Sequence, residues 1–528
     1  MKKQSLYKPV VLIILDGWGI NPAWGRNIIS SARPKHFDYY WRNYPHLVLQ
    51  SFSKIASSTG IVSMPEYGHA IIGSGRLVYP PSKLISDQVQ SGSFYQNHVL
   101  NDITNQAFNN KSSIHLIGLI SNAGVVSELD HLYALISYFK TKALPNLYIH
   151  GILDGVDSGP TDGIGFIDHL EQKLKSLNYG NLVTLMGRKW IFEDEVNDVN
   201  IQASISTLVS THKAYKAQTG VDLIKYSYNK NASDADVAPT IILSEDPERS
   251  RIKSNDIVIF FNFKDENVKK AIDDLSGKAK QIYSLVDYHN TKTTPIFTDT
   301  KIENHLTQVI NENHLKQLKI TDNNKEKHLC YYFNGMSEKR FFREKRIIIK
   351  SEYNLDPTKY PELNLYELMN KTKNEIHLKN YDFAAINIPN VDIVAHSGDI
   401  LACQKSIIYT DEALSTIVEE VLQKQGCVLI TSDHGNAEEL GVVSSLKQQV
   451  KHFHTLNPVP LIMVNPDNKI QKPKIIQTVD SGSIIGQIVQ SELSTADIAP
   501  TILELLGIDK PIEMHGKSLL STLNSKNT

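Results

Sequence analysis

Short runs of consecutive apolar residues recur along this chain and predict buried strands. The first run, 10–15, is composed only of valine, leucine and isoleucine, which is typical of a strand covered on both faces. After about Lys83 the runs come in series, and we expect further strands at 114–120, 147–153, 182–186, 256–263, 281–286, 329–333, 346–350, 382–388, 427–432 and 460–464.

Amphipathic stretches separate these runs, so that strands and helices alternate. We expect helices at 26–40, 131–142, 165–177, 201–218, 364–373, 400–424 and 495–506. Ser63-Met64-Pro65-Glu66 has the form of a capping box, which predicts a helix with Ser63 as its N-cap and Pro65 in its first turn. The charged run 322–327 is interpreted as an exposed loop. Alternation of this kind predicts an α/β protein.

The chain has 528 residues, more than one ordinary core accommodates, so we expect two α/β domains. The polar stretch 290–313 is interpreted as a linker that returns the chain to its first domain. We therefore expect one domain made of residues 1–80 and 314–528, interrupted by a second domain made of residues 81–313.

The amino-acid composition excludes two classes of binding partner. A hydrophobic fraction of 41%, a charged fraction of 21% and a net charge of -2 are typical of a globular protein that binds neither nucleic acid nor a membrane surface. No run approaches the roughly 20 apolar residues of a membrane span, and the apolar run after Met1 is too short for a signal peptide. Cys330, Cys403 and Cys427 are expected to be reduced core residues. We expect a cytoplasmic monomer.

Carboxylates and imidazoles gather where the predicted strands end. Asp16 ends the first strand, Asp433 and His434 follow the run 427–432, and Asp392 precedes His396 by four residues. His454 precedes the last predicted strand. Alone, Asp16 could be a turn residue and each Asp-His pair could be structural. Together they favour a metal site, and a ligand set without thiolates suits manganese or zinc better than magnesium. The remaining histidines considered are interpreted as packing or surface residues: His69, His131 and His452.

Several motifs carry a resemblance to a known family. They are LDGWG at 15–19, HGILDG at 150–155, VAHSG at 394–398, SDHGNA at 432–437, His454-Thr455 before NPVP at 457–460, and DIAPT at 497–501. In these the chain resembles the cofactor-independent (2,3-bisphosphoglycerate-independent) phosphoglycerate mutases of the alkaline phosphatase superfamily.

The resemblance implies a fold, a cofactor and an activity. It implies an alkaline-phosphatase-like domain interrupted by a phosphotransferase-like domain, and two Mn²⁺ ions. One ion would be held by Asp392, His396 and His454, and the other by Asp16, Asp433 and His434. In the family a serine takes the phosphoryl group of 3-phosphoglycerate and returns it to the 2-position, a step of glycolysis. Two cations would activate that serine and neutralise the charge that develops on the phosphoryl group.

The sequence departs from the family where the substrate reacts. The nucleophilic serine is replaced by Pro65, which has no hydroxyl group. Ser63 is the nearest alternative, although we favour it as an N-cap. The family's catalytic histidine falls at Val126 and one of its arginines at Val156. Two further arginine positions are Asp194 and Asn267. The substrate-binding residues that the resemblance retains or replaces with another cation are Asp157, Arg188, Lys264 and, in place of the active-site lysine, Arg340.

Three interpretations remain open. The chain could be a working phosphoglycerate mutase that uses another hydroxyl group. It could be a two-metal hydrolase of another phosphate ester that uses metal-bound hydroxide. It could also be a non-catalytic binding or regulatory protein in which the metals stabilise the fold. We favour loss of serine-mediated transfer, and a small phosphorylated metabolite is the expected partner.

Overall fold

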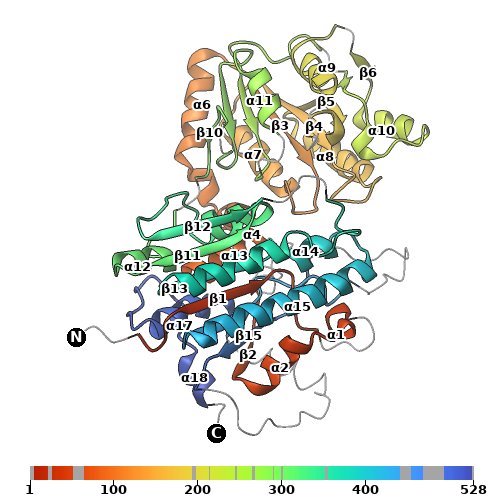
Figure 1. Ribbon diagram of the computed structural model, residues 1–528. Coiled ribbons are helices and arrows are strands. Elements are labelled where there is room, and N and C mark those ends of the chain that lie inside the picture. The colour runs from red at the N-terminus through yellow and green to blue at the C-terminus, as the bar shows by residue number, and fades with distance from the viewer. Residues whose placement is uncertain are drawn as a thin grey trace. The chain divides into compact units, whose positions relative to one another are not determined.

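The computed structural model describes residues 5–21, 27–51, 65–192, 198–212, 214–243, 246–264, 268–288, 291–298, 301–350, 355–440, 454–467 and 493–525. The chain forms two compact units (Figure 1), the first comprising Met1–Tyr79 with Thr300–Thr528 and the second Pro80–Asp299. Residues 300–313 thus belong to the first unit and not to the interrupting domain as expected. The reason is helix α12 (Leu306–Glu312), which buries Leu306, Val309 and Ile310 in the core of the first unit.

The first unit is built on a seven-stranded sheet in the order β12-β11-β13-β1-β14-β15-β2. Its strands are β1 (Val10–Leu15), β2 (His46–Leu49), β11 (Gln317–Asp322), β12 (Glu344–Ile349), β13 (Phe383–Ile388), β14 (Cys427–Thr431) and β15 (Val459–Val464). The strands from β12 to β14 are parallel, whereas β15 runs antiparallel to both β14 and β2. β1 therefore lies in the middle, with the carboxyl ends of β13 and β14 on either side.

Helices cover both faces of this sheet. Alternate residues of β1 point to opposite faces, so its apolar side chains contribute to the core on each side. Val11, Ile13 and Leu15 pack against one group of helices, of which Figure 1 shows α13 and α15 lying along the sheet. The core on the other face is filled from a second group. The helices and turns of the unit are α1 (Ile28–Ala32), α2 (Lys35–Asn43), α4 (Pro65–Ser74), α12, η4 (Asn323–Lys325), the π-helix η5 (His328–Tyr332), α13 (Leu365–Leu378), α14 (Asn390–Ala395), α15 (Ile400–Gln423), η6 (Thr495–Asp497), α17 (Ile498–Leu505) and α18 (Leu520–Ser525).

Two expectations for this unit are wrong for local physical reasons. The helix expected at 26–40 divides into α1 and α2, because Pro34 has no amide hydrogen for an intrahelical bond and disfavours the helical conformation at Arg33. The strand expected at 329–333 is the π-helix η5, and the strand is instead β11, just before it. A short apolar run does not by itself distinguish a strand from a buried helix.

The second unit has an eight-stranded sheet in the order β10-β9-β8-β3-β4-β5-β7-β6. Its strands are β3 (Ile114–Ile120), β4 (Leu147–Leu153), β5 (Asn181–Gly187), β6 (Tyr215–Ala217), β7 (Thr240–Ile242), β8 (Ile257–Phe260), β9 (Gln281–Ser284) and β10 (Thr294–Pro295). Its helices and turns are α5 (Pro81–Ser91), η1 (Ser93–Gln96), α6 (His98–Asn110), α7 (Leu129–Thr141), α8 (Gly163–Leu177), η2 (Arg188–Trp190), α9 (Asp198–Val209), α10 (Gly220–Tyr228), η3 (Asp234–Asp236) and α11 (Lys269–Leu275). The helix expected at 201–218 ends early, and β6 occupies its last part.

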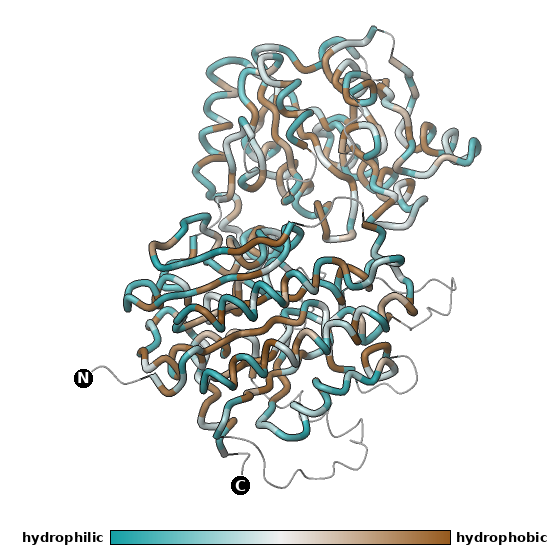
Figure 2. Tube along the Cα trace, viewed as in Figure 1, coloured by the Kyte–Doolittle hydropathy of each residue, from teal (hydrophilic) through white to brown (hydrophobic). Residues whose placement is uncertain are grey.

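Hydropathy along the chain follows this architecture (Figure 2), with hydrophobic colour on inner strands and mixed colour along helices. The three cysteines are buried and free, as predicted. In the part of the chain that the structure describes, no helix combines the length and apolarity needed to cross a membrane.

Candidate metal centre

The candidate ligands meet because three neighbouring strands end at one edge of the first sheet. Residues 10–15 of β1 pair in parallel with residues 383–388 of β13, and β14 pairs with the other side of β1. Asp16 directly follows β1, and Asp433 and His434 follow β14. Asp392 lies in α14, which begins two residues after β13. Ligands of open α/β sheets bind at this carboxyl edge.

The structure brings the six predicted ligands together. Ligand atoms of Asp16, Asp433 and His434 lie within 4.8 Å of one another, and so do those of Asp392, His434 and His454. His396 completes the second group, since its Nε2 lies 3.0 Å from Nε2 of His454 and 3.5 Å from Oδ1 of Asp392. His434 is therefore close to both groups.

The donor set fits a divalent cation. Oδ1 of Asp433 is buried without a hydrogen-bond partner, and Nε2 of His434 lies 3.3 Å from Oδ1 of Asp16 and 3.4 Å from Oδ2 of Asp433. Buried polar atoms are normally paired, and buried oxygen and nitrogen atoms that converge on one point can be satisfied by a bound cation. Oxygen and imidazole ligands suit Mn²⁺ or Zn²⁺.

Electrostatics keep the carboxylates ionised. Burial raises the pKa of Asp16 and of Asp392, but the Lys325 ammonium group and the neighbouring histidines together outweigh burial and lower both pKa values below the usual range. Burial lowers the pKa of His434, whereas the carboxylate of Asp433 and its neighbours raise it to about 10. A bound cation would take the place of that proton, because a metal ligand must be a neutral imidazole.

Lys325 is the main site residue that the sequence did not reveal. Its Nζ lies 3.1 Å from Oδ2 of Asp16 and 2.9 Å from Oδ2 of Asp392, and its side chain is buried. These carboxylates overcome burial and raise the pKa of Lys325. The interpretation of 322–327 as an exposed loop was wrong, because Asp322 is also buried and caps the turn η4. Arg340, expected as the active-site cation, is exposed.

A second set of buried side chains orients the ligands. Asn387 donates from Nδ2 to Oδ2 of Asp16 at 3.2 Å, which turns its Oδ1 toward Nε2 of His69 at 3.1 Å. Nδ1 of His69 lies 3.1 Å from Oδ2 of Asp433, and this carboxylate raises the pKa of His69 against the effect of burial. His69, interpreted from the sequence as a packing or surface histidine, instead positions a candidate ligand. Asn436 donates from Nδ2 to Oδ1 of Asp392 at 2.8 Å.

Helix α4 begins beside these ligands. Pro65 is its first residue, and Gly68 lies one turn later against Asp433. A Cβ atom at Gly68 would lie 2.9 Å from the carbonyl oxygen of Asp433, so only glycine permits this approach. Helix α4 therefore packs closely against the loop that carries Asp433. Ser63 lies outside the described residues.

Two candidate substrate residues of the second unit, Asp157 and Arg188, lie together after the ends of β4 and β5. Nη1 of Arg188 donates to Oδ1 of Asp154 at 2.8 Å and to Oδ2 of Asp157 at 2.7 Å. Val156 beside them is 62% exposed, whereas Val126 is buried. Lys264 follows β8 and is partly buried. The remaining two positions, Asp194 and Asn267, and also His452, lie outside the described residues.

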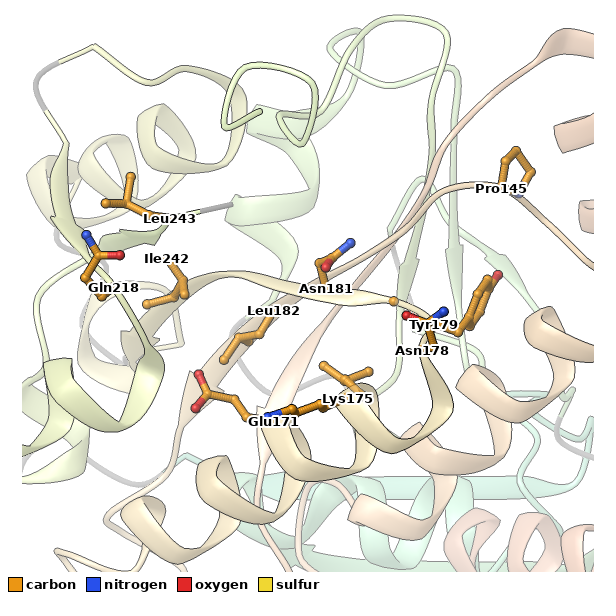
Figure 3. A pocket seen from close by; sticks show the side chains of 12 residues that line it. Pro145, Glu171, Lys175, Asn178, Tyr179, Asn181, Leu182, Gln218, Ile242 and Leu243 are labelled. Carbon is orange, nitrogen blue, oxygen red and sulfur yellow. The ribbon is translucent and has the colours of Figure 1, made fainter. Parts of the chain in front are cut away.

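The second unit also has a pocket of about 500 Å³, shown in Figure 3. Glu171, Lys175 and Tyr179 line it from α8 and the turn that follows, and Asn181 lines it from the start of β5. Because Arg188 follows the other end of β5, the pocket lies at the opposite edge of the sheet from the Arg188 cluster. It is not part of the candidate site.

Comparisons with known proteins agree with this architecture. The metalloenzyme superfamily matches residues 8–510. A 2,3-bisphosphoglycerate-independent phosphoglycerate mutase from Clostridium botulinum is 33% identical, covering 97% of this chain and 99% of that protein. One from Acetivibrio thermocellus is 31% identical with the same coverage.

Among solved structures, Leishmania mexicana phosphoglycerate mutase, crystallised at low cobalt concentration, aligns with a TM-score of 0.75 and 19% identity. The alignment covers 98% of this chain and 99% of that one, and it shows the same mixed α/β fold. Sequence identity to the curated relatives extends over nearly the whole chain. This chain therefore belongs to the family of 2,3-bisphosphoglycerate-independent phosphoglycerate mutases.

Proposed function

We propose that this chain holds two divalent cations and hydrolyses a small phosphate monoester without the serine-mediated transfer of the phosphoglycerate mutases. The observation that carries the proposal is Pro65 at the start of α4, the helix that Gly68 seats against Asp433. The resemblance aligns this position with the nucleophilic serine, and proline has no oxygen to attack phosphorus. The metal ligands are nevertheless all retained.

Each of the two ligand groups would bind one cation. Asp392, His396 and His454 would hold one cation, and Asp16, Asp433 and His434 the other. When bound, such a pair polarises the phosphoryl oxygens and lowers the pKa of water toward neutrality, so hydrolysis needs no serine. His396, whose side chain is 43% exposed, marks the open side of the centre.

Residues of the first unit that surround the ligands compensate their charges and fix their orientation. Lys325 compensates the charges of Asp16 and Asp392 from within the protein. His69 and Asn436 hold Asp433 and Asp392 in place through the hydrogen bonds described above. Fixed dipoles and charges of this kind stabilise a transition state without reorganisation during the reaction.

The substrate is expected to differ from phosphoglycerate. Val126 and Val156 stand where the resemblance places a histidine and an arginine, and neither side chain donates a hydrogen bond. Arg188 persists, but its Nη1 is already engaged by Asp154 and Asp157. Recognition of a carboxylate and a phosphate normally uses bidentate arginine, so a substrate that carries both groups would be held weakly.

Assays with the Mn²⁺-loaded protein test the proposal. We expect no formation of 2-phosphoglycerate from 3-phosphoglycerate under conditions in which the Clostridium botulinum relative is active. We expect release of inorganic phosphate from at least one ester in a panel of phosphorylated metabolites, and loss of this release in Asp433→Ala.

Each alternative has a distinct outcome. Robust 2-phosphoglycerate formation would show that another hydroxyl group replaces the serine and would overturn the proposal. Release of phosphate from none of the esters would favour a non-catalytic protein that keeps metals for stability. Pro65→Ser alone should not restore mutase activity, because Val126 and Val156 remain.

A further inference from the structure

A fully buried carboxylate, that of Glu438, connects three segments of the first unit. Its Oε2 accepts from the backbone amides of Gly19 at 3.2 Å and Asn436 at 2.8 Å. Its Oε1 accepts from the side chains of Thr455, in close contact, and Asn457 at 3.0 Å. A carboxylate offers about four lone-pair positions, and here four donors converge on them.

Two glycines make this arrangement possible. A Cβ atom at Gly19 would overlap the carboxyl carbon of Glu438, and one at Gly435 would overlap Oε1 of Glu438 and the hydroxyl group of Thr455. Neither glycine has a positive φ, so backbone conformation does not require them. These two positions lack a side chain because Glu438 and its partner Thr455 occupy the space between the loops.

Each connected segment carries or adjoins candidate metal ligands. Gly19 lies three residues after Asp16, Asn436 is two residues from His434, and Thr455 follows His454. Asn436 also binds Asp392 directly. Backbone bonds reinforce the same junction, since the amide of Asn436 donates to the carbonyl of Gly17 and that of Thr455 to the carbonyl of Gly435.

We infer that Glu438 is a positioning residue whose carboxylate fixes the three ligand-bearing segments relative to one another, so that both cation sites are formed before metal binds. This inference rests on the proposed two-metal centre. Glu438 points its oxygens at the loops and not at the ligand atoms, so it acts through Asp16, His434 and His454. Residues that orient ligands typically change metal affinity by about 10- to 100-fold when they are replaced.

Glu438→Gln tests the inference, because glutamine keeps the shape of the side chain but presents an NH₂ group to donors that need acceptors. Calorimetric titration of the EDTA-treated full chain with Mn²⁺ alone is the measurement. We expect two Mn²⁺ ions per wild-type chain and about 10- to 100-fold weaker binding to the variant. Circular dichroism of the metal-free variant checks that it is folded.

A matched control is Glu420→Gln, which removes a buried carboxylate of α15 that is bonded to His377. This control should bind Mn²⁺ with the same affinity as the wild type. It therefore distinguishes the general effect of losing a buried carboxylate from a specific effect on the position of the metal ligands. Equal affinity of folded Glu438→Gln and wild type would overturn the inference. Absence of Mn²⁺ binding by the wild type would instead refute the proposed metal centre on which it rests.

A second variant decides the question if Glu438→Gln does not fold. Thr455→Val removes one of the four donors and leaves the carboxylate and the histidine ligands in place. We expect a several-fold loss of Mn²⁺ affinity with little change in the unfolding temperature of the metal-free protein. Unchanged Mn²⁺ affinity in this variant would contradict the positioning role, as would equal affinity of folded Glu438→Gln and wild type.

Discussion

Lys325 shows how one residue changes the electrostatics of the candidate metal centre. Asp16 and Asp392 are buried, and two unpaired buried carboxylates would be expensive to maintain. The ammonium group of Lys325 reaches both, so the metal-free site already contains an internal cation. A bound metal and Lys325 therefore share the same carboxylates. The lysine stabilises the fold and, at the same time, lowers the gain from binding metal.

Replacing Lys325 should separate these two effects. We expect Lys325→Met to destabilise the metal-free protein by about 3–5 kcal/mol, because it removes the ammonium group that compensates the charges of two buried carboxylates. The same variant should be stabilised more by Mn²⁺ than the wild type is. Thermal unfolding with EDTA and with Mn²⁺ measures both quantities. Lys327→Met, at an exposed neighbour, is the control, and a metal-free Lys325→Met as stable as this control would contradict the prediction.

At the scale of elements, polar residues buried within strands are accommodated by their neighbours across the sheet. β11 was not predicted because Gln317 and Lys319 interrupt its apolar character, yet both are buried. Nζ of Lys319 lies 3.3 Å from Oε1 of Glu344 on β12 and also contacts Asn334. A strand with buried polar residues can be recognised only when the adjacent strand that supplies their partners is known. By contrast, β3 and β4 coincide with the predicted runs 114–120 and 147–153, because apolar side chains cover nearly all of both faces.

The second sheet contains a ladder of buried polar groups across β3, β4 and β5. Oγ1 of Thr184 lies 2.8 Å from Nδ1 of His150, whose Nε2 lies 2.9 Å from Nδ1 of His115. Nε2 of His115 in turn lies 3.3 Å from Oδ2 of Asp256. One proton on Nε2 of each ring satisfies the whole ladder with both histidines neutral. Burial lowers the pKa of His115. The pKa of His150 lies well below its usual value, because burial and the nearby His115 and Arg251 all lower it.

This ladder predicts acid sensitivity of the second unit. Because the folded-state pKa values lie below the unfolded value of about 6.5, the unfolded chain binds more protons and stability falls as pH decreases through 6.5. Between pH 7.5 and 5.5 the two histidines should together cost up to about 3 kcal/mol. Urea unfolding of the second unit across this range measures the loss. His150→Gln should reduce the pH dependence by about one proton, and an unchanged slope in this variant would argue against the ladder as its source.

At the scale of the whole molecule, the candidate ligands all belong to one of the two units. Asp16 and Asp433 lie in the first unit although 417 positions separate them, because β1 and β14 are adjacent in the sheet. The second unit has its own sheet and its own buried strands. Metal binding should therefore stabilise the first unit and leave the intrinsic stability of the second unchanged.

Amide hydrogen exchange can test this division. With Mn²⁺ at about 100 times its Kd, linkage adds about 2.7 kcal/mol to the stability of the unit that binds it. We expect exchange to slow in β1, β13 and β14 and to stay the same in β3 and β4 when Mn²⁺ replaces EDTA. Asp433→Ala should abolish the difference. Equal protection of both sheets would show that the two units do not unfold independently.

The sequence alone determined the strands with continuous apolar runs, the identity of the six candidate ligands and the family resemblance, because each depends on residues close together in the chain. Tertiary structure alone decided what surrounds those ligands. Lys325 lies in a charged run that by itself predicts an exposed loop, and His69 and Glu438 carry no local signal of a role at the metal centre. The partner of a charged side chain depends on which strands become neighbours, and the pairing of β1 with β13 and β14 brings together residues hundreds of positions apart.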